Sequence, residues 1–186
     1  MKASRRAEMG LPASVGQVVG PAAGQSLPTG VRIRPARQDD AAAIRALVHQ
    51  ARIYPFGLHW PRFLVAVDAG DTVLGCAQIR IHPDGCREVA SVAVAPAARR
   101  RGIASCLVTR LMHTFPPPLY LVCRSGLVAW YARLGFREVG REQALPLHYR
   151  RLRWFLAGLG WLRPGGEKPA IMVWEASEGS GPARVV

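Results

Sequence analysis

The stretch that decides the fold is EVASVAVAPAARRRGIA, from Glu88 to Ala104. Five of its first seven residues, up to Val94, are apolar and three of these are valine, which predicts a buried strand. A proline and three arginines follow, and apolar residues one helical turn apart from Ile103 onward predict a helix. A strand, a basic loop with one glycine and the start of a helix therefore follow one another directly.

This junction of strand and helix has the features of an anion-binding site. Backbone N–H groups at a helix N-terminus lack partners within the helix, and the helix dipole adds positive potential there. Gly102 lets the backbone approach a phosphate closely, while Arg99, Arg100 and Arg101 add positive charge. The dipole alone contributes only about 0.3–1 kcal/mol, so several N–H donors must act together. The sequence predicts a phosphate-binding loop.

Strand-like and helix-like patterns alternate on both sides of this stretch, which predicts one α/β or α+β domain at residues 31–176. Residues 1–30 and 177–186 lack such patterns, and we expect them to be flexible tails. The turn sequences DAGD and HPDG, which begin at Asp68 and His82, predict hairpins. The other expected elements are strands at 31–34, 63–67, 72–81, 119–122 and 170–175, a helix capped by Asp39 or Asp40, and a helix at 127–134.

A basic, aromatic segment at residues 147–163 precedes the last expected strand. Arginine mixed with Trp, Phe and Leu would suit an amphipathic lid, a contact between two subunits or a helix on an anionic membrane surface. Gly158 and Gly160 weaken continuous helix formation. We therefore favour a lid, a subunit contact or a surface covering, which leaves a homodimer open.

The composition is that of a globular protein with a strongly basic balance. Hydrophobic residues make up 49% of the chain, the formal net charge is +13 and the pI is 11.1. This charge would suit nucleic acid, an anionic membrane or a polyanionic cofactor. No helix-turn-helix, zinc-finger, RNA-binding or P-loop signature accompanies it, so the sequence argues against a nucleic-acid partner.

The cysteines indicate small buried thiols. Cys76, Cys86, Cys106 and Cys123 lie in or beside apolar runs, without a C-x-x-C pair or histidines at zinc-binding spacing. The sequence therefore predicts no metal site. It also has no convincing signal peptide and no apolar stretch of about 18 residues or more, so we expect a cytoplasmic protein with reduced thiols and no membrane partner.

The loop resembles the pyrophosphate loop of the GNAT superfamily of N-acyltransferases. In that family a strand ending in V-x-P is followed by Q/R-x-x-G-x-G/A, and here Val94 and Pro96 are followed by Arg99, Gly102 and Ala104. The resemblance implies a mixed, mainly antiparallel central sheet flanked by helices. It also implies that the fourth and fifth strands splay apart to admit CoA.

A second match lies downstream. The family has a tyrosine four residues before a Gly-Phe pair, as Tyr131 precedes Gly135 and Phe136 here. Arg124 stands where members usually carry an asparagine that contacts the cofactor. The strand that begins at Glu88, together with this later segment, resembles GNAT-type acetylglutamate synthases, although no amino-acid kinase domain accompanies it.

The resemblance implies roles for individual residues. Glu88 is the candidate general base, directly or through water, and Tyr131 is the candidate acid that protonates the departing thiolate. The Val94 backbone N–H is the candidate oxyanion donor, and His82, near Glu88, is the one histidine that we single out as an alternative base. The expected cofactor-binding residues are Val92, Ala93, Val94, Arg99, Arg100, Arg101, Gly102, Ile103, Ala104 and Arg124.

These features predict an enzyme that moves an acetyl group from acetyl-CoA to a primary amine within a ternary complex. The acceptor could be a small molecule or a protein, and residues 53–60 are expected to select it. A longer acyl-CoA is left open as the donor. The alternative from another class is a non-catalytic acyl-CoA-binding or regulatory module, which would keep the loop without needing Glu88 or Tyr131.

Overall fold

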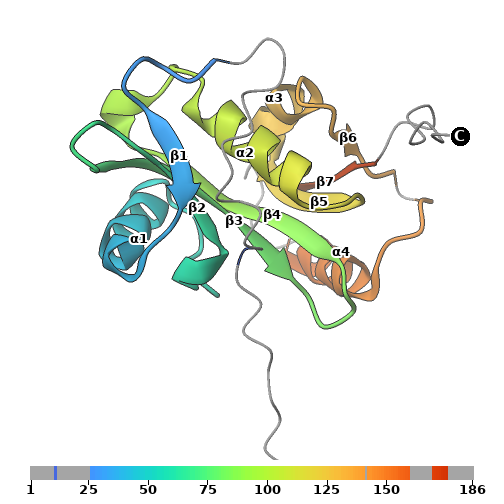
Figure 1. Ribbon diagram of the computed structural model, residues 1–186. Helices are drawn as coiled ribbons and strands as arrows, with labels where there is room; N and C mark the ends of the chain where they lie inside the picture. Colours follow the sequence, from blue (N-terminus) through green and yellow to red (C-terminus); the bar gives the residue numbers. More distant parts are fainter. Residues whose placement is uncertain (1–10, 12–25, 141, 160–168, 176–186) are drawn as a thin grey trace, which may run out of the picture. The chain divides into compact units, whose positions relative to one another are not determined.

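The computed structural model describes residues 11, 26–140, 142–159 and 169–175. Within these residues the chain forms seven strands and four α-helices (Figure 1). The strands are β1 (Arg32–Pro35), β2 (Phe63–Val67), β3 (Val73–Ile81), β4 (Arg87–Val94), β5 (Leu119–Arg124), β6 (Arg137–Glu138) and β7 (Pro169–Trp174). The helices are α1 (Ala41–Gln50), α2 (Ile103–Thr114), α3 (Val128–Ala132) and α4 (Leu147–Leu159).

The strands are hydrogen-bonded in the order β1-β2-β3-β4-β5-β7-β6. The pairs β1–β2, β2–β3, β5–β7 and β6–β7 are antiparallel, and β4–β5 is parallel. A mixed, mainly antiparallel sheet with helices is the predicted fold class, and it is confirmed. The chain divides into two compact units, one of Met1–Ile79 and Ser91–Thr114 and the other of Arg80–Ala90 and Phe115–Val186.

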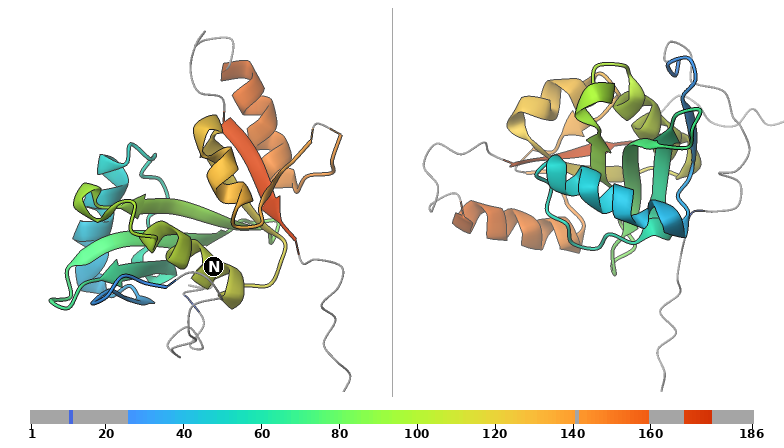
Figure 2. Two further views of the ribbon diagram at one scale, coloured as in Figure 1. Left: turned by 90° about the horizontal axis from the view of Figure 1, so that it is seen from above. Right: turned by 90° about the vertical axis from the view of Figure 1, so that its left-hand side faces the viewer.

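The first unit is built around β2. All five residues of β2 are fully buried, so both faces of the strand are covered, and alternate residues must face opposite sides. Phe63, Val65 and Val67 share one core cluster with Ile44, Leu47 and Val48 of α1. Helix α1 thus buries an apolar face against β2, and it is the blue helix in Figures 1 and 2.

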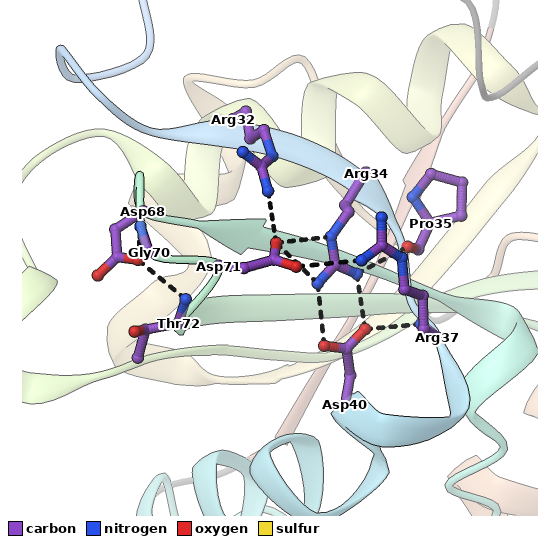
Figure 3. Close-up of polar contacts among 9 residues, drawn as sticks. All are labelled: Arg32, Arg34, Pro35, Arg37, Asp40, Asp68, Gly70, Asp71 and Thr72. Carbon is purple, nitrogen blue, oxygen red and sulfur yellow. Dashed lines mark hydrogen bonds and ion pairs between the residues drawn. The ribbon is translucent and has the colours of Figure 1, made fainter.

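An ion-pair network fixes the start of the first unit (Figure 3). The Arg34 guanidinium donates to Asp40 Oδ2 at 2.7 Å and to Asp71 Oδ1 at 3.1 Å. The Asp40 carboxylate also accepts from the Arg37 backbone N–H at 2.6 Å. Asp40 stands directly before α1, as predicted, but its side chain makes no cap hydrogen bond to that helix. Its carboxylate pairs with Arg34 of β1 instead, and Arg34 also binds Asp71 in the turn between β2 and β3.

The second unit is built around β5 and β7, which pair along their whole length from Leu119↔Trp174 to Arg124↔Pro169. Tyr149 of α4 is fully buried in one core cluster with Tyr120 of β5 and Val173 of β7. Figure 2 shows α4 lying beside β7. The first two residues of β4 also belong here, because Arg87 and Glu88 pair with the first two residues of β5.

Several predicted boundaries need correction. The helix expected at 127–134 is the shorter α3, preceded by a 3-10 turn at Ser125–Leu127, and the strand expected at 119–122 extends to Arg124. In the basic segment, α4 runs continuously through Gly158, so that glycine does not interrupt the helix. Gly160 and the residues up to 168 lie outside the described residues, as do nearly all of the expected tails. None of the described helices is long and apolar enough to span a membrane.

Candidate functional site

The predicted phosphate-binding loop leads directly into α2 in the first unit. Arg100 and Gly102 both have left-handed backbone conformations, with φ of 63° and 79°. Arg99, Arg100 and Arg101 are exposed, Ile103 is buried, and Ala104 is half-buried. A side chain at Gly102 would meet no atom within 4 Å, so it is the positive φ and not a lack of space that favours glycine there.

The start of α2 is electrostatically suited to an anion. The helix has 12 residues and no acidic residue in its first turn. Its first N–H groups have no partners inside the helix, because the earliest bond of this kind runs from Cys106 N to Gly102 O at 3.0 Å. Open backbone donors, a positive helix end and three exposed arginines therefore meet at one loop.

The end of β4 supports this loop through close packing. A Cβ atom at Gly75 of β3 would lie 3.1 Å from the Ala93 carbonyl oxygen and 3.1 Å from Ile103 Cγ2. Ala95 N donates to Leu74 O at 2.8 Å, and Arg99 Nε donates to Val94 O at 3.2 Å. The sequence analysis did not predict this role of Gly75. An isolated glycine inside a strand pattern is the signal that could have indicated it.

A second missed feature is a break in the middle of β4. Ser91 has φ of 52°, although it lies within a strand, and its side chain is buried. Its hydroxyl accepts a hydrogen bond of 2.9 Å from Nε2 of the fully buried Gln78. A left-handed residue in a strand interrupts the regular ladder, as in a β-bulge, directly before the predicted CoA-pairing residues Val92, Ala93 and Val94.

The candidate base Glu88 lies in the second unit, in a polar cluster that is largely shielded from solvent. Glu88 is 8% exposed, and its Oε2 lies 2.7 Å from His82 Nε2 and 3.9 Å from Arg80 Nη1. The structure thus brings together Glu88 and His82, the two residues that sequence reasoning considered as bases. They form a hydrogen-bonded pair.

The third member of the cluster, His148, was not predicted. It lies in the first turn of α4, and its ring stacks on that of His82 with 3.5 Å between centroids and 19° between planes. Burial, and secondarily the neighbouring His82, lowers the pKa of His148. The predicted turn at His82 is also present, since Gly85 N donates to His82 O at 2.9 Å.

Asp84 joins this turn to α4. Its Oδ2 accepts from the His148 backbone N–H at 2.9 Å, and its Oδ1 accepts from the Cys86 N–H at 3.2 Å. Bonding to the His148 N–H is the main cause that lowers the pKa of Asp84 to about 2. Because the pKa of Asp84 is lowered, this bond stabilises the fold at pH values above the usual carboxyl pKa. This contribution to stability is lost as the pH falls through about 2.

The candidate acid Tyr131 is also in the second unit, but in different surroundings. It is 6% exposed, and its ring makes edge contacts with Trp130 and Phe136 at centroid distances of 4.6 and 5.8 Å. Burial raises the pKa of its hydroxyl. Gly135 has φ of 92° and ends this segment, as the Gly-Phe motif requires. Arg124 is the exposed last residue of β5.

The four cysteines are unpaired, as expected. Burial raises the pKa of the Cys76 thiol to about 12, which makes it an inert packing group. Among the described residues one trio has metal-ligand chemistry, namely His82, Glu88 and His148, whose ligand atoms lie within 4.8 Å of one another. The cysteines take no part in it.

The segment expected to select the acceptor lies in the first unit. Its residues 54–57 are exposed, whereas Ile53, Leu58 and Trp60 pack against the core. Tyr54 and Phe56 are 77% and 74% exposed, and their rings are stacked with 6.2 Å between centroids. Beside them is an open hollow of about 500 Å³, lined by residues from His49 to Pro55.

Comparison with solved structures gives a shared fold. The N-acetylglutamate synthase of Neisseria gonorrhoeae, solved with coenzyme A and N-acetyl-glutamate, is 22% identical with a TM-score of 0.60, and the match covers 77% of this chain and 34% of the synthase. This chain thus spans about a third of the length of that synthase. Rv2747 of Mycobacterium tuberculosis, solved with CoA, is 22% identical with a TM-score of 0.57, and the match covers 78% of this chain and 99% of Rv2747.

A third structure of the same fold has an acceptor in its name. The ribosomal-protein-S18-alanine N-acetyltransferase of Escherichia coli is 18% identical with a TM-score of 0.53, and the match covers 84% of this chain and 99% of that enzyme. The search of curated proteins gives no significant match.

The family assignment rests on the sequence itself. A model of the acetyltransferase (GNAT) family matches residues 33–136, more than half of the 186 residues. The match includes the predicted phosphate-binding loop, Glu88 and the Tyr131 motif. Enzymes of this family take the acetyl group from acetyl-CoA. The resemblance seen in the sequence is therefore confirmed, and the chain belongs to the acetyltransferase (GNAT) family.

Proposed function

We propose that this protein is an N-acetyltransferase that transfers an acetyl group directly from acetyl-CoA to a primary amine. The observation that carries the proposal is the loop before α2, where two left-handed residues, Arg100 and Gly102, precede a helix with open N–H donors and no acidic first turn. Family membership and the CoA bound to two structures of the same fold support the donor. Acetyl-CoA is our first choice over a longer acyl-CoA.

In this proposal the loop holds the CoA pyrophosphate. Backbone N–H groups from Gly102 to Ala104 bind the phosphates, and Arg99, Arg100 and Arg101 neutralise them. Backbone groups of Val92, Ala93 and Val94 pair with the pantetheine chain, as the family resemblance implies. The substitution of Arg124 for the usual asparagine places a charged side chain, in place of an amide, at a customary cofactor contact.

The chemistry needs a base, an oxyanion donor and an acid. We assign Glu88 to accept a proton from the acceptor ammonium, which leaves a neutral amine to attack the thioester carbon. The Val94 N–H would stabilise the oxyanion, a contribution of about 2.7–4 kcal/mol in an enclosed site. After the attack the nitrogen loses its surplus proton to solvent, and Glu88 likewise releases the proton that it accepted. When the C–S bond breaks, Tyr131 would protonate the thiolate to give CoA-SH, and the tyrosine would recover its proton from solvent.

The acceptor is assigned only to a broad chemical class. A primary amine, on a small molecule or on a protein, follows from the family. The sequence resemblance to acetylglutamate synthases favours a small amino acid or amine, and the exposed Tyr54 and Phe56 are the candidate acceptor contacts. The cytoplasmic location and the homodimer remain predictions.

Calorimetric titration with acetyl-CoA tests the loop. We expect the wild type to bind and Gly102→Asp to lose at least about ten-fold in affinity, because the substitution puts a negative charge beside the pyrophosphate and strains the positive φ. Gly30→Asp is the matched control, since Gly30 also has φ of 79° and open space around it. A wild type that binds no acetyl-CoA would refute the proposal. Equal losses in both variants would show a backbone effect only.

Turnover is then measured as release of the CoA thiol with defined amines. The panel comprises single amino acids, polyamines and a peptide with a free N-terminus. Thiol release that depends on an added amine supports the enzyme. Binding without release for any amine would favour the non-catalytic acyl-CoA-binding module.

A further inference from the structure

The Glu88 cluster contains more than a base. Glu88 and His82 are joined by the 2.7 Å contact between Oε2 and Nε2, and both side chains are about nine-tenths shielded from solvent. An ionised carboxylate can only accept hydrogen bonds, so His82 is the donor and its Nε2 carries the proton. This bond holds one of the two carboxylate oxygens, Oε2, in a fixed position.

His82 is in turn held by α4. The His148 ring covers one face of His82 at 3.5 Å, and Tyr149 meets both histidine rings edge-on at 6.1 and 5.2 Å. Because Tyr149 is fully buried, the first turn of α4 is locked into the core formed with β5 and β7. The His82 ring therefore cannot turn away without disturbing this helix.

Asp84 provides a second link between the turn that carries His82 and α4. It lies two residues after His82, and its carboxylate accepts from the His148 backbone N–H at 2.9 Å. A carboxylate at a helix N-terminus is favourable, because it satisfies an open N–H donor and interacts with the positive end of the dipole. The turn that carries His82 and the helix turn that carries His148 are thus tied together at two points.

A shared metal ion explains this cluster less well. A nitrogen lone pair lies in the plane of its imidazole ring, so two rings stacked face to face at 19° keep their lone pairs in two nearly parallel planes. An ion bound by both would have to lie in both ring planes, as tetrahedral ligation requires converging ligands. The stack is instead what two packed rings adopt when neither binds metal.

We propose that His148 and Asp84 are positioning residues for catalysis: by docking the first turn of α4 on the turn between β3 and β4, they hold His82 and, through it, the Glu88 carboxylate. This inference rests on the proposed role of Glu88 as the base. It gives α4 a function different from that of a mobile lid, because the start of the helix is part of the support for the base.

Steady-state thiol release with acetyl-CoA and the best amine of the panel tests this. General bases contribute about 10²–10⁴-fold, so loss of their alignment in His148→Ala should lower kcat about ten-fold. The KM for acetyl-CoA should not change. His148→Phe keeps a flat ring against His82 and should have a kcat near the wild-type value. Asp84→Ala should lower kcat, as His148→Ala does. His113→Ala, an exposed histidine at the end of α2, is the control.

A second measurement needs no acceptor. Nitrogen-15 NMR of the imidazole rings should show His82 protonated at Nε2 in the wild type and in His148→Phe, with the hydrogen-bonded signal shifted or exchange-broadened in His148→Ala. Wild-type kcat in His148→Ala, or no recovery in His148→Phe despite a folded protein, would overturn the proposal. So would one equivalent of zinc per purified chain. If instead the wild type neither binds acetyl-CoA nor releases thiol, the proposed function fails, and the NMR result still decides whether α4 positions His82.

Discussion

Arg100 and Gly102 adopt similar left-handed conformations in the loop, but at different cost. Glycine populates this region freely, whereas a non-glycine residue there is strained by about 1–3 kcal/mol. Arg100 is exposed, so packing does not account for its conformation. Successive N–H groups in left- and right-handed conformations form a concave anion site, and a bound phosphate would offset the strain. The backbone outlier thus supports the loop assignment independently of the sequence motif.

At Tyr149 the energetic cost comes from burial of a polar group and not from backbone strain. Its hydroxyl is buried and has no hydrogen-bond partner among the residues that the structure describes, and burial, followed by the charge of Glu88, raises its pKa. A buried polar group without a partner destabilises a fold by about 1–3 kcal/mol. The ring itself packs in the core with Tyr120 and Val173. The ring therefore stabilises the core, whereas the hydroxyl adds no hydrogen bond with a described residue.

We expect Tyr149→Phe to leave the free energy of unfolding unchanged or to raise it by about 1 kcal/mol, because it removes the unpaired hydroxyl and keeps the ring. Urea denaturation followed by circular dichroism measures this. Tyr131→Phe is the comparison, since it makes the same chemical change at another buried tyrosine. A loss of more than about 1 kcal/mol in Tyr149→Phe would show that the hydroxyl binds a partner, such as a buried water.

At the scale of elements, the sequence pattern predicted those features that depend on interactions between residues close together in the chain. The bounds of β2 were predicted correctly, because an apolar run between turn signals is buried on both faces. The Asp68 turn formed as its Asx chemistry implies, with Oδ1 accepting from the N–H groups of Gly70 and Thr72. The loop and the start of α2 were also visible, since glycine and helix periodicity mark them.

Features that depend on contacts distant in sequence were not predicted. His148 reaches His82 across 66 positions, a pairing that no periodicity encodes. The left-handed Ser91 is stabilised by Gln78 from a neighbouring strand, so its own sequence looks like a regular strand. Helix α4 continues through Gly158 although glycine disfavours helices by about 1 kcal/mol. One glycine is too small a cost to end a helix whose first turn is anchored by Tyr149.

The contact of β3 with the start of α2 gives a prediction at this scale. Gly75→Ala would put a Cβ 3.1 Å from both a backbone oxygen of β4 and the Ile103 side chain, so α2 or the strands must shift. Overpacking of this kind costs about 1–3 kcal/mol. We expect lower stability and weaker acetyl-CoA binding, because the shift begins at the phosphate loop.

Thermal unfolding and calorimetry check both effects. Gly70→Ala is the control, since its nearest neighbour would be a side-chain oxygen at an ordinary 3.5 Å. Wild-type affinity in Gly75→Ala would mean that the loop tolerates a displaced helix start.

At the scale of the whole molecule, the site residues are divided between the two units. The phosphate loop and Val94 belong to one, whereas Glu88, His82, Tyr131 and Arg124 belong to the other. The division passes through β4 between Ala90 and the left-handed Ser91. A single strand thus carries the candidate base in one unit and the predicted CoA-pairing residues in the other, which links the two sets of candidate residues covalently.

The net charge of +13 allows a last test between cofactor and nucleic acid. Binding to DNA through scattered arginines depends on counterion release, and such binding weakens about 10³-fold or more between 50 and 200 mM salt. A loop that offers fixed backbone N–H donors is less sensitive, because hydrogen bonds at short range are screened little. We therefore expect acetyl-CoA affinity to fall by less than about ten-fold over this range, while any binding to random duplex DNA is lost. Calorimetry and fluorescence anisotropy, carried out in matched buffers, give the two salt slopes. A steep slope for acetyl-CoA together with DNA binding that survives 200 mM salt would mean that the basic loop serves nucleic acid and that its likeness to a pyrophosphate site is not used.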